Sequence, residues 1–190
     1  MTRSSISVDI NVSEEFSLQA ERAGKTLFTF ANEWLGAASK ISAEGGTANE
    51  LMGNWKVFSV LKQVDVITLP ADFVEELITN LYALEKENLF KKFSKLGSDL
   101  VSIMKIAAPD VGQLTFLARE FAGIIPTKRI DIRTEGNGIQ VDIVGAGRKI
   151  ETTECSFEFV KSILIGYGYR ITSQEIGIGI VRIKGTKLGG

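Results

Sequence analysis

The stretch "RIDIRTEGNGIQVDIV" (residues 129–144) decides the fold, because apolar and polar residues alternate on both sides of a turn. Asn137 and Gly138 form a favoured two-residue hairpin turn, since both residue types accept positive φ. With this turn at the tip, Ile132 pairs with Ile143. The register places five apolar side chains on one face, which we expect to face the core: Ile130, Ile132, Ile139, Val141 and Ile143.

The same register pairs Thr134 with Val141 and, on the opposite face, Arg133 with Asp142. Asp131 lies on this charged face too. Opposite charges commonly face one another across neighbouring strands. We therefore interpret the three charged residues as a solvated cross-strand group rather than as catalytic groups.

Helical and strand patterns alternate around the hairpin. Before it, "PDVGQLTFLAREFAG" (residues 109–123) indicates a helix, with Asp110 and Gln113 as a capping pair and Gly123 at the C-terminal end. After it, "ECSFEFVKSILIGYG" (residues 154–168) returns to helical spacing. Two further strands are indicated by "YRIT" and "IGIGIVRI".

The glycines of "GYGYRITSQEIGIGIVRIK" (residues 166–184) do not form a dinucleotide-binding motif, because the G-x-G-x-x-G spacing fails at each pair. Gly166 and Gly168 follow a helix, and we interpret them as its end and a turn. We interpret Gly177 and Gly179 as interior strand positions, where a bare backbone admits either an aromatic side chain of the protein or a ligand. The candidate ligand-binding residues are therefore Tyr167, Tyr169, Gly177 and Gly179.

Residues 72–106 carry two apolar stripes at three- and four-residue steps that are out of phase across "EKEN" (residues 85–88). The pattern indicates either one long helix with a register shift or two helices that break near Glu87. The stripes form either core or a seam with a partner, since a helix this long often outruns its own domain. For the seam, the candidate interface residues are Leu89, Phe93, Leu96 and Leu100.

The N-terminal part begins with "SISVDINV" (residues 5–12), whose alternation indicates a half-buried strand. Apolar spacing then indicates a helix over residues 14–39, weakened in its middle by Gly24. A shorter helix is indicated over residues 49–63, and residues 64–69 are strand-like.

The chain of 190 residues contains no histidine. This excludes Ser-His-Asp and Cys-His catalysis and nearly every zinc or haem site built by this chain alone. Carboxylate and lysine chemistry and oxygen-ligand Mg²⁺ or Ca²⁺ sites stay open. Because no such constellation is visible, we predict no catalytic residues, no metal and no cofactor. We interpret Cys155, the single cysteine, as a small buried hydrophobic residue.

The charge is balanced, with 22 basic and 23 acidic residues. Proteins that bind nucleic acid usually show a basic surplus or stripe, so we do not expect such a partner. No apolar run approaches the ~18 residues needed to span a bilayer, and the N-terminus carries no signal-like segment. We therefore expect a cytoplasmic protein without a membrane span.

The order helix, hairpin, helix, hairpin from Asp110 onwards resembles the 4-vinyl reductase domain family, which is related in fold to the TRAPP vesicle-tethering subunits. The resemblance rests on three stretches within residues 110–185, namely "IDIRTEGNGIQVDIV", "SFEFVKSILIGYGYRIT" and "EIGIGIVRIKG". The resemblance implies helices on an antiparallel sheet, dimerisation and sensing of small, largely apolar molecules. Many members carry cysteines and a turn between the last two strands that this chain lacks, so the resemblance transfers no functional residue.

The sequence predicts an α+β fold in which helices, including one long helix, pack on an antiparallel sheet formed mainly by the C-terminal half. We expect an N-terminal region (residues 1–108) with one strand and otherwise mainly helices. An α+β region of hairpin, helix and hairpin (residues 109–185) should form one compact domain with it, followed by a flexible tail (residues 186–190). The predicted function is a non-catalytic small-molecule-binding or sensory module that is homodimeric. The alternative is a structural or adaptor protein that assembles through its long helix.

Overall fold

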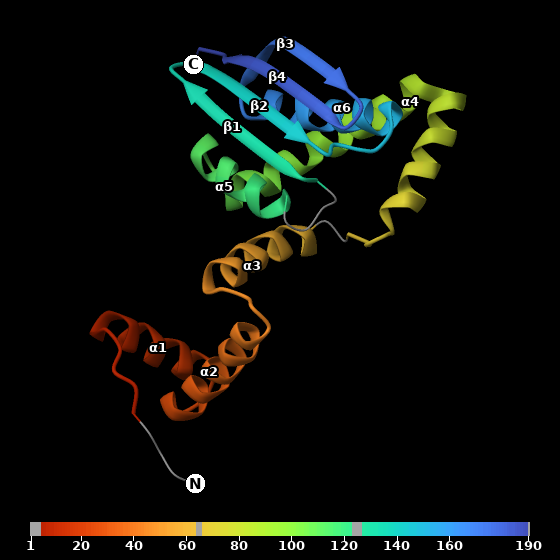
Figure 1. Cartoon of the computed structure of the whole chain (residues 1–190). Coiled ribbons are helices and arrows are strands. Elements are labelled where there is room, and N and C mark those ends of the chain that lie inside the picture. Colours follow the sequence, from red (N-terminus) through yellow and green to blue (C-terminus); the bar gives the residue numbers. More distant parts are fainter. Residues whose placement is uncertain (1–4, 64–65, 123–126, 190) are drawn as a thin grey trace. The chain divides into compact units, whose positions relative to one another are not determined.

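Residues 5–63, 66–122 and 127–189 are described by a computed structural model of the chain, shown in Figure 1. Its internal contacts divide the chain into two compact units, residues 1–51 and residues 52–190. The sheet belongs to the larger unit, and the smaller unit is helical.

The larger unit contains a sheet of four strands: β1 (Arg129–Glu135), β2 (Gly138–Val144), β3 (Tyr169–Gly177) and β4 (Ile180–Lys187). Their order is β1-β2-β4-β3, and each neighbouring pair is antiparallel. Two hairpins therefore lie side by side, joined through β2 and β4. This confirms the predicted antiparallel sheet in the C-terminal half.

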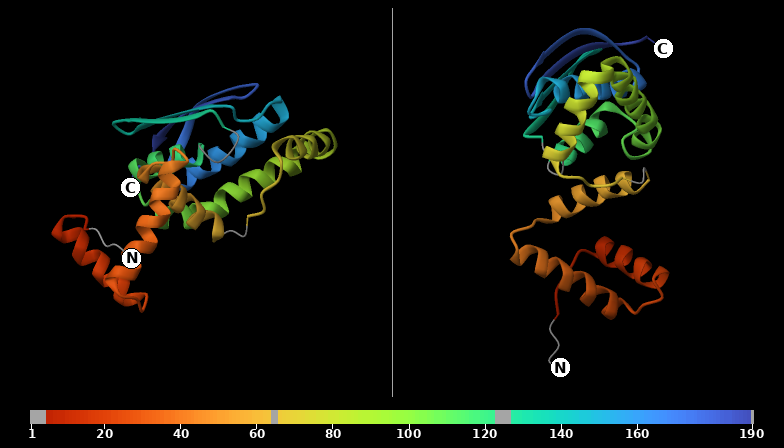
Figure 2. Two further views of the ribbon diagram at one scale, coloured as in Figure 1. Left: turned by 60° about the horizontal axis from the view of Figure 1, so that its bottom comes forward. Right: turned by 90° about the vertical axis from the view of Figure 1, so that its right-hand side faces the viewer.

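Helices cover one face of this sheet in two successive layers. α5 (Val111–Ala122) packs against β1, and α6 (Ile150–Gly166) packs against β3 and β4. α4 (Ala71–Ala107) packs against α6 on the side away from the sheet (Figure 2). The α+β fold with one long helix is thus confirmed.

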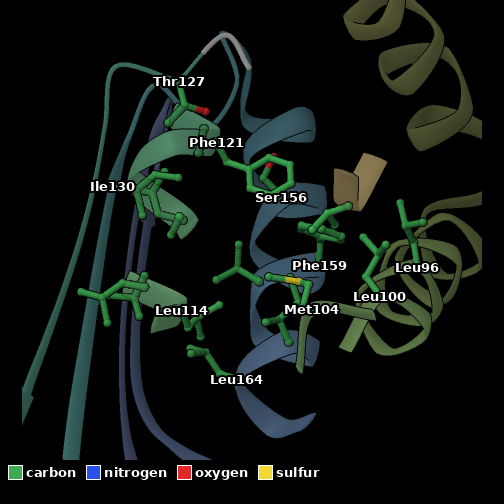
Figure 3. Close-up of a pocket in the computed structure, with 18 of the residues that line it drawn as sticks. Leu96, Leu100, Met104, Leu114, Phe121, Thr127, Ile130, Ser156, Phe159 and Leu164 are labelled. Carbon is green, nitrogen blue, oxygen red and sulfur yellow. The ribbon is translucent and has the colours of Figure 1, made fainter. Parts of the chain in front are cut away.

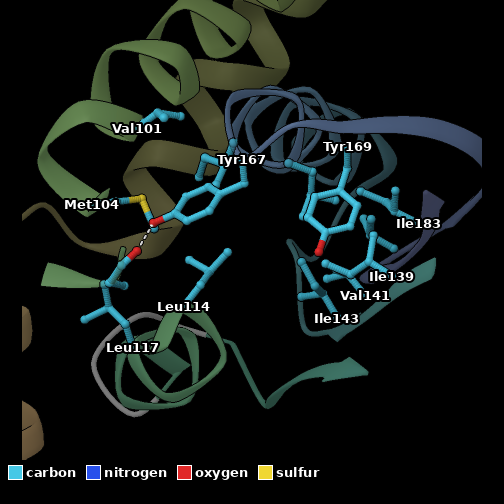
Figure 4. Packing of buried hydrophobic residues seen from close by; sticks show 14 of the residues in the cluster. Val101, Met104, Leu114, Leu117, Ile139, Val141, Ile143, Tyr167, Tyr169 and Ile183 are labelled. Carbon is cyan, nitrogen blue, oxygen red and sulfur yellow. Dashed lines mark hydrogen bonds between the residues drawn. The ribbon is translucent and has the colours of Figure 1, made fainter. Parts of the chain in front are cut away.

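The core lies between the sheet and the helices. Along β4 the buried Val181 and Ile183 alternate with exposed charged residues, so the sheet has one apolar and one polar face. At the end of the helix layer, the Tyr167 hydroxyl donates a hydrogen bond of 2.7 Å to the carbonyl oxygen of Ala108, which ties the end of α6 to the end of α4 (Figure 4).

α3 (Ala48–Lys62) agrees with the short helix predicted over residues 49–63. Its Val57 and Val60 side chains are buried and belong to the core of the larger unit. The strand-like pattern of residues 64–69 is wrong where it can be checked, because residues 66–69 have no regular structure and residues 64–65 lie outside the described residues.

The first hairpin has its turn one residue earlier than predicted. Gly136 takes the first turn position with φ of 54°, so the turn is Gly136–Asn137 rather than Asn137–Gly138. Glycine adopts this left-handed conformation with the least strain. Moving the turn by one residue changes each pairing by two, so every side chain keeps its face. The observed pairs are Ile132 with Val141 and Thr134 with Ile139.

The shifted register also corrects the charged face of the hairpin. Asp142 lies opposite Asp131, not opposite Arg133. The repulsion is relieved from β4, because the Arg182 Nε donates a hydrogen bond of 2.6 Å to Asp142. Burial raises the pKa of Asp142, but the hydrogen bonds from Arg182 and Gln140 outweigh it, and the net pKa is lowered.

α4 is two helical segments that meet at a kink. Glu85 has non-helical dihedrals, φ −149° and ψ 52°, within the span Ala71–Ala107. The two apolar stripes change phase at this point. The second segment buries Leu89, Val101 and Met104, whereas Leu77, Leu81 and Leu84 of the first segment are exposed. Of the two alternatives left open by the sequence, the break within "EKEN" is confirmed.

The smaller unit is a hairpin of two helices, α1 (Ile10–Arg22) and α2 (Leu27–Ala43). The single helix predicted over residues 14–39 is therefore wrong. Gly24 does more than weaken it: its φ is 66°, which ends α1. The Thr26 hydroxyl oxygen then accepts a hydrogen bond from the backbone of Thr29 and caps α2.

The strand predicted over residues 5–12 is also wrong for the single chain. Residues 5–9 have no regular structure, and α1 begins at Ile10. The Asp9 carboxylate accepts a hydrogen bond of 2.9 Å from the Asn11 backbone and caps this helix. A strand exists only with a partner strand, and none lies beside residues 5–9 in the described part of the chain.

Two further sequence predictions concern helix ends and boundaries. The Asp110 carboxylate accepts a hydrogen bond of 2.9 Å from the Gln113 backbone, which confirms the capping pair of α5. Gly123, predicted at the other end, lies outside the described residues. The predicted boundary between residues 108 and 109 separates α4 from α6. In the structure these two helices pack against each other across that boundary.

Taken singly, none of the helices in the described residues has both the length and the apolar composition to cross a membrane. α4 and α5 reach that composition only as a pair, across a bend of 109°.

Candidate ligand-binding cavity

A cavity of about 610 Å³ lies inside the larger unit, between the sheet and its helices (Figure 3). The first hairpin contributes four aliphatic side chains to its wall, namely Ile130, Ile132, Val141 and Ile143. The facing wall is made by α6 with Phe159, Val160, Ile163 and Leu164. The size falls in the range of small-molecule sites in proteins.

Three further helices complete the wall. α4 contributes Leu96, Leu100, Ile103 and Met104, and α5 contributes Leu114, Ala118 and Phe121. The end of α3 adds Val60 and Leu61. Because these segments are far apart in the sequence, the cavity exists only once the larger unit has folded.

Polar groups are few in this wall. Among the described residues that line it, those with polar side chains are Asp99, Thr127 and Ser156. The Ser156 hydroxyl donates a hydrogen bond of 2.9 Å to the Thr152 carbonyl oxygen, so its donor is already used. The Asp99 carboxylate is exposed and paired with Lys95. The cavity therefore favours a ligand that is mostly apolar.

A close helix crossing holds two walls of the cavity at a fixed distance. A Cβ atom added at Gly97 of α4 would lie 2.4 Å from the Phe159 carbonyl oxygen of α6. Only a residue without a side chain fits this approach. Leu100, one turn further along α4, and Phe159 both face the cavity (Figure 3).

The structure places none of the four predicted ligand-binding residues in this lining. Gly177 and Gly179 are not interior strand residues: Gly177 ends β3, and Gly179 lies in the two-residue turn to β4 with φ of 71°. This turn is also the one that the sequence interpretation took to be missing. The interpretation was wrong because alternation continues through a tight turn.

Gly179 lets that turn pack closely against neighbouring parts of the chain. Its N–H donates a hydrogen bond of 2.9 Å to the Thr153 hydroxyl of α6, and its carbonyl oxygen accepts one of 2.7 Å from the Gly145 backbone. An added Cβ would lie 2.9 Å from the Gly147 carbonyl oxygen. A larger residue at Gly179 would therefore strain the hairpin rather than fill a pocket.

Tyr167 and Tyr169 are core residues on either side of a glycine. Tyr169 packs among the side chains of β2 and β4, and Tyr167 reaches the end of α4 (Figure 4). Burial, and next the charge of Asp110, raise the pKa of Tyr167 to about 12. Its hydroxyl therefore stays protonated at neutral pH and remains a hydrogen-bond donor.

The four predicted interface residues divide between core and surface. Leu89 is buried and Phe93 half-buried. Leu96 is 50% exposed, while the half-buried Leu100 faces the cavity. A continuous seam for a partner is thus not formed by all four residues in this arrangement.

No group of three or more potential metal ligands was found among the residues that the structure describes. Cys155 is buried, as predicted, and burial raises the pKa of its thiol to about 11. The charged cluster nearby is satisfied internally: Glu154 accepts from the Tyr82 hydroxyl and pairs with Lys86 at 2.8 Å. These contacts join α4 to α6 and support the fold.

The sequence predicts an apolar pocket lined by the helix of residues 156–167 and by the strand that carries Gly177 and Gly179. That helix, α6, does line the cavity, but the two glycines do not. The inward face of the first hairpin, which we expected to face the core, lines the cavity as well. A close-packed core and a core with a hollow have the same sequence pattern. Only the positions of α4 and α5 distinguish them.

Comparisons with known proteins leave the chain without a family. No family model matches it, and no curated protein matches it. A search of solved structures finds a doubly substituted variant of Tt H-NOX, with 16% sequence identity, a TM-score of 0.38 and coverage of 71% of this chain and 85% of that chain. A likeness this weak assigns neither a fold nor a function.

Proposed function

We propose that the larger unit is a non-catalytic module that binds a small, mostly apolar molecule and senses its presence. The observation that carries the proposal is the apolar cavity of about 610 Å³ between the first hairpin, α4, α5 and α6. Burial of apolar surface would supply the binding free energy, at about 25 cal/mol for each Å² removed from water.

A sensing role is supported by where the cavity lies. Its walls belong to separate elements of one core, so a ligand that fills the space adds contacts to several of them at once. Such a ligand stabilises the folded unit by RT ln(1 + L/Kd), where L is the free ligand concentration. The binding signal is then a change in the stability and mobility of the helix layer.

Filling the cavity tests the proposal. Ala118→Phe places a ring in the space, and we expect the affinity for the neutral apolar probe 1-aminoanthracene, measured by fluorescence titration, to fall at least tenfold. Ala83→Phe, on the exposed side of α4, adds the same ring outside the cavity and should leave the affinity unchanged.

Native mass spectrometry of freshly purified protein is the companion measurement. An added mass that leaves on mild denaturation would begin to identify the ligand. If the wild-type chain binds no 1-aminoanthracene, or if both phenylalanine variants bind it as well as wild type, the cavity is not a binding site.

The resemblance of residues 110–185 to the 4-vinyl reductase domain family remains part of this proposal, since none of the comparisons tests it. So does the homodimer that the resemblance implies. Assembly through the long helix is the competing proposal, and it predicts that Leu96→Asp dissociates an oligomer without unfolding the protomer.

A further inference from the structure

The smaller unit leaves its apolar side chains uncovered. Within its described residues, Ala20 is the one buried hydrophobic residue. The α2 side chains of Leu27, Trp34 and Leu35 are 41%, 53% and 51% exposed. A unit of about 50 residues cannot be stable when so little apolar surface is removed from water. Something outside this unit must cover these side chains.

The exposed side chains of α2 share one side of the helix. At about 100° per residue, positions 27, 34 and 35 fall within roughly a third of the helix circumference. On α1, Phe16 packs edge-on against Phe30 of α2, which holds the two helices together. The uncovered side is therefore a continuous apolar face of a fixed helical hairpin.

The segment before α1 carries a second uncovered apolar row. Ile6, Val8 and Ile10 are 68%, 60% and 69% exposed and alternate with Ser5, Ser7 and Asp9. This is the pattern of a strand with one apolar and one polar face. Its backbone lacks a strand partner in the described chain.

We propose that two copies of this chain pair their residues 5–9 as a two-stranded antiparallel ribbon, whose apolar face covers the helical hairpins of both copies. The partner is a second copy of the chain, because pairing of two copies would cover both the strand-like segment and the apolar face of α2.

Two-fold symmetry fixes the register. In an antiparallel pair, two residues that lie directly opposite each other point to the same face. The apolar residues of both copies therefore share a face only if the symmetry axis passes between two copies of the same residue. With the axis at Ser7, Ser5 lies opposite Asp9 and Ile6 opposite Val8. Residues 5–9 are then all paired, and Ile6 and Val8 of the two copies form one face of four aliphatic side chains. Five residues is an ordinary length for a strand.

Such an interface is isologous and closed, so it gives a dimer and not a filament. It also explains why the sequence predicts a strand that the single chain does not form. The alternation is real, and the missing element is the partner strand.

Disulfide trapping in the full chain tests the register. Ser7→Cys puts two thiols opposite each other across the axis, where the Cα atoms of an antiparallel pair lie about 4.5–5.5 Å apart, a separation that a disulfide spans. With a mild oxidant, we expect most of the chain to become a covalent dimer. Ser42→Cys, exposed on α2, is the matched control and should cross-link at least tenfold more slowly. The native Cys155 is buried and should not contribute.

Charge placed on each face of the ribbon is the second test. Ile6→Lys with Val8→Lys should convert the dimer into a monomer in sedimentation velocity. Ser5→Lys, which lies opposite Asp9 on the other face, should leave it dimeric. Residues 5–9 belong to no regular element of the single chain, so these changes cannot unfold the larger unit. A monomeric wild type at tens of micromolar, equal cross-linking at both cysteines, or a dimer lost through Leu96→Asp alone would overturn the proposal.

Discussion

The two units of this chain handle their apolar residues in opposite ways. In the larger unit, the sheet provides a broad apolar face and three helices close over it, so that Val181 and Ile183 are completely buried. In the smaller unit, α1 meets α2 through the Phe16–Phe30 ring contact, and large apolar side chains such as Trp34 and Leu35 stay more than half exposed. A helical hairpin alone has no third layer to close its core.

A helical core therefore closes only when a further layer covers it, whether that layer comes from the same chain or from a partner. The larger unit carries that layer as α4, which packs on α6 through the Gly97 crossing. The smaller unit carries a candidate covering layer, residues 5–9, but this segment lacks a partner strand in the described chain. Substitutions at equivalent kinds of position should therefore act differently in the two units.

Truncating a buried leucine should give the largest contrast. Leu117 on α5 is 2% exposed, so Leu117→Ala should lower the free energy of unfolding by about 2–5 kcal/mol through lost burial and a new cavity. Urea denaturation followed by near-ultraviolet circular dichroism of the tyrosines measures it, since Tyr82, Tyr167 and Tyr169 all lie in the larger unit.

Leu35→Ala is the matched change in the smaller unit, where the side chain is 51% exposed. It should alter the same tyrosine transition by no more than about 0.5 kcal/mol. Equal effects from the two leucines would show that the units share one core.

A second contrast concerns two helical glycines. Alanine normally favours a helix over glycine by about 1 kcal/mol. Gly36→Ala in α2 should follow this rule, because nothing lies within 4 Å of the added Cβ. Gly97→Ala in α4 should reverse it and destabilise the larger unit by about 1–3 kcal/mol, because the Cβ meets the α6 backbone at 2.4 Å.

Thermal and urea unfolding of the two glycine variants, each against wild type, measure the signs. A stabilised Gly97→Ala protein would mean that α4 and α6 lie further apart than described, and the cavity wall would then need revision.

The smallest effect is expected from alkaline pH. The pKa of Tyr167 is raised to about 12 in the folded chain from an ordinary value near 10. The folded state thus holds a proton that the unfolded state loses first, so stability is full below pH 10 and falls as pH rises towards 12. Tyr167→Phe should be less stable at neutral pH, through loss of the Ala108 hydrogen bond, but should lose less on going from pH 9 to 11.5.

Tyr82→Phe is the parallel variant for this titration, because burial, and next the hydrogen bond to Glu154, raise the pKa of Tyr82 as well. Comparing the two variants separates the contributions of the two tyrosines. If Tyr167→Phe and wild type lose stability in parallel between pH 9 and 11.5, Tyr167 is not the group that titrates.

The sequence predicted those elements whose signals are local. The three- and four-residue steps located α5, α6 and both segments of α4, and the change of phase across "EKEN" located the kink at Glu85. The faces of the first hairpin followed from alternation even though its turn was misplaced, because a shift of one turn residue conserves the faces.

The sequence predictions failed where one local pattern is compatible with two different structures. Gly136 and Asn137 compete with Asn137 and Gly138 for the same turn, and only tertiary packing chooses between them. Gly177 and Gly179 alternate with isoleucines whether they lie in a strand or flank a turn. A pocket on the helix of residues 156–167 was predicted, but its other walls were not, because they depend on how closely the first hairpin, α3, α4 and α5 approach that helix.

One consequence follows from the exposed segment of residues 5–9. The polar face of this segment carries Asp9 beside Ser5 and Ser7. A ribbon of two copies would therefore present two carboxylates on that face. Like charges repel, so this face would repel the phosphates of a nucleic acid rather than bind them.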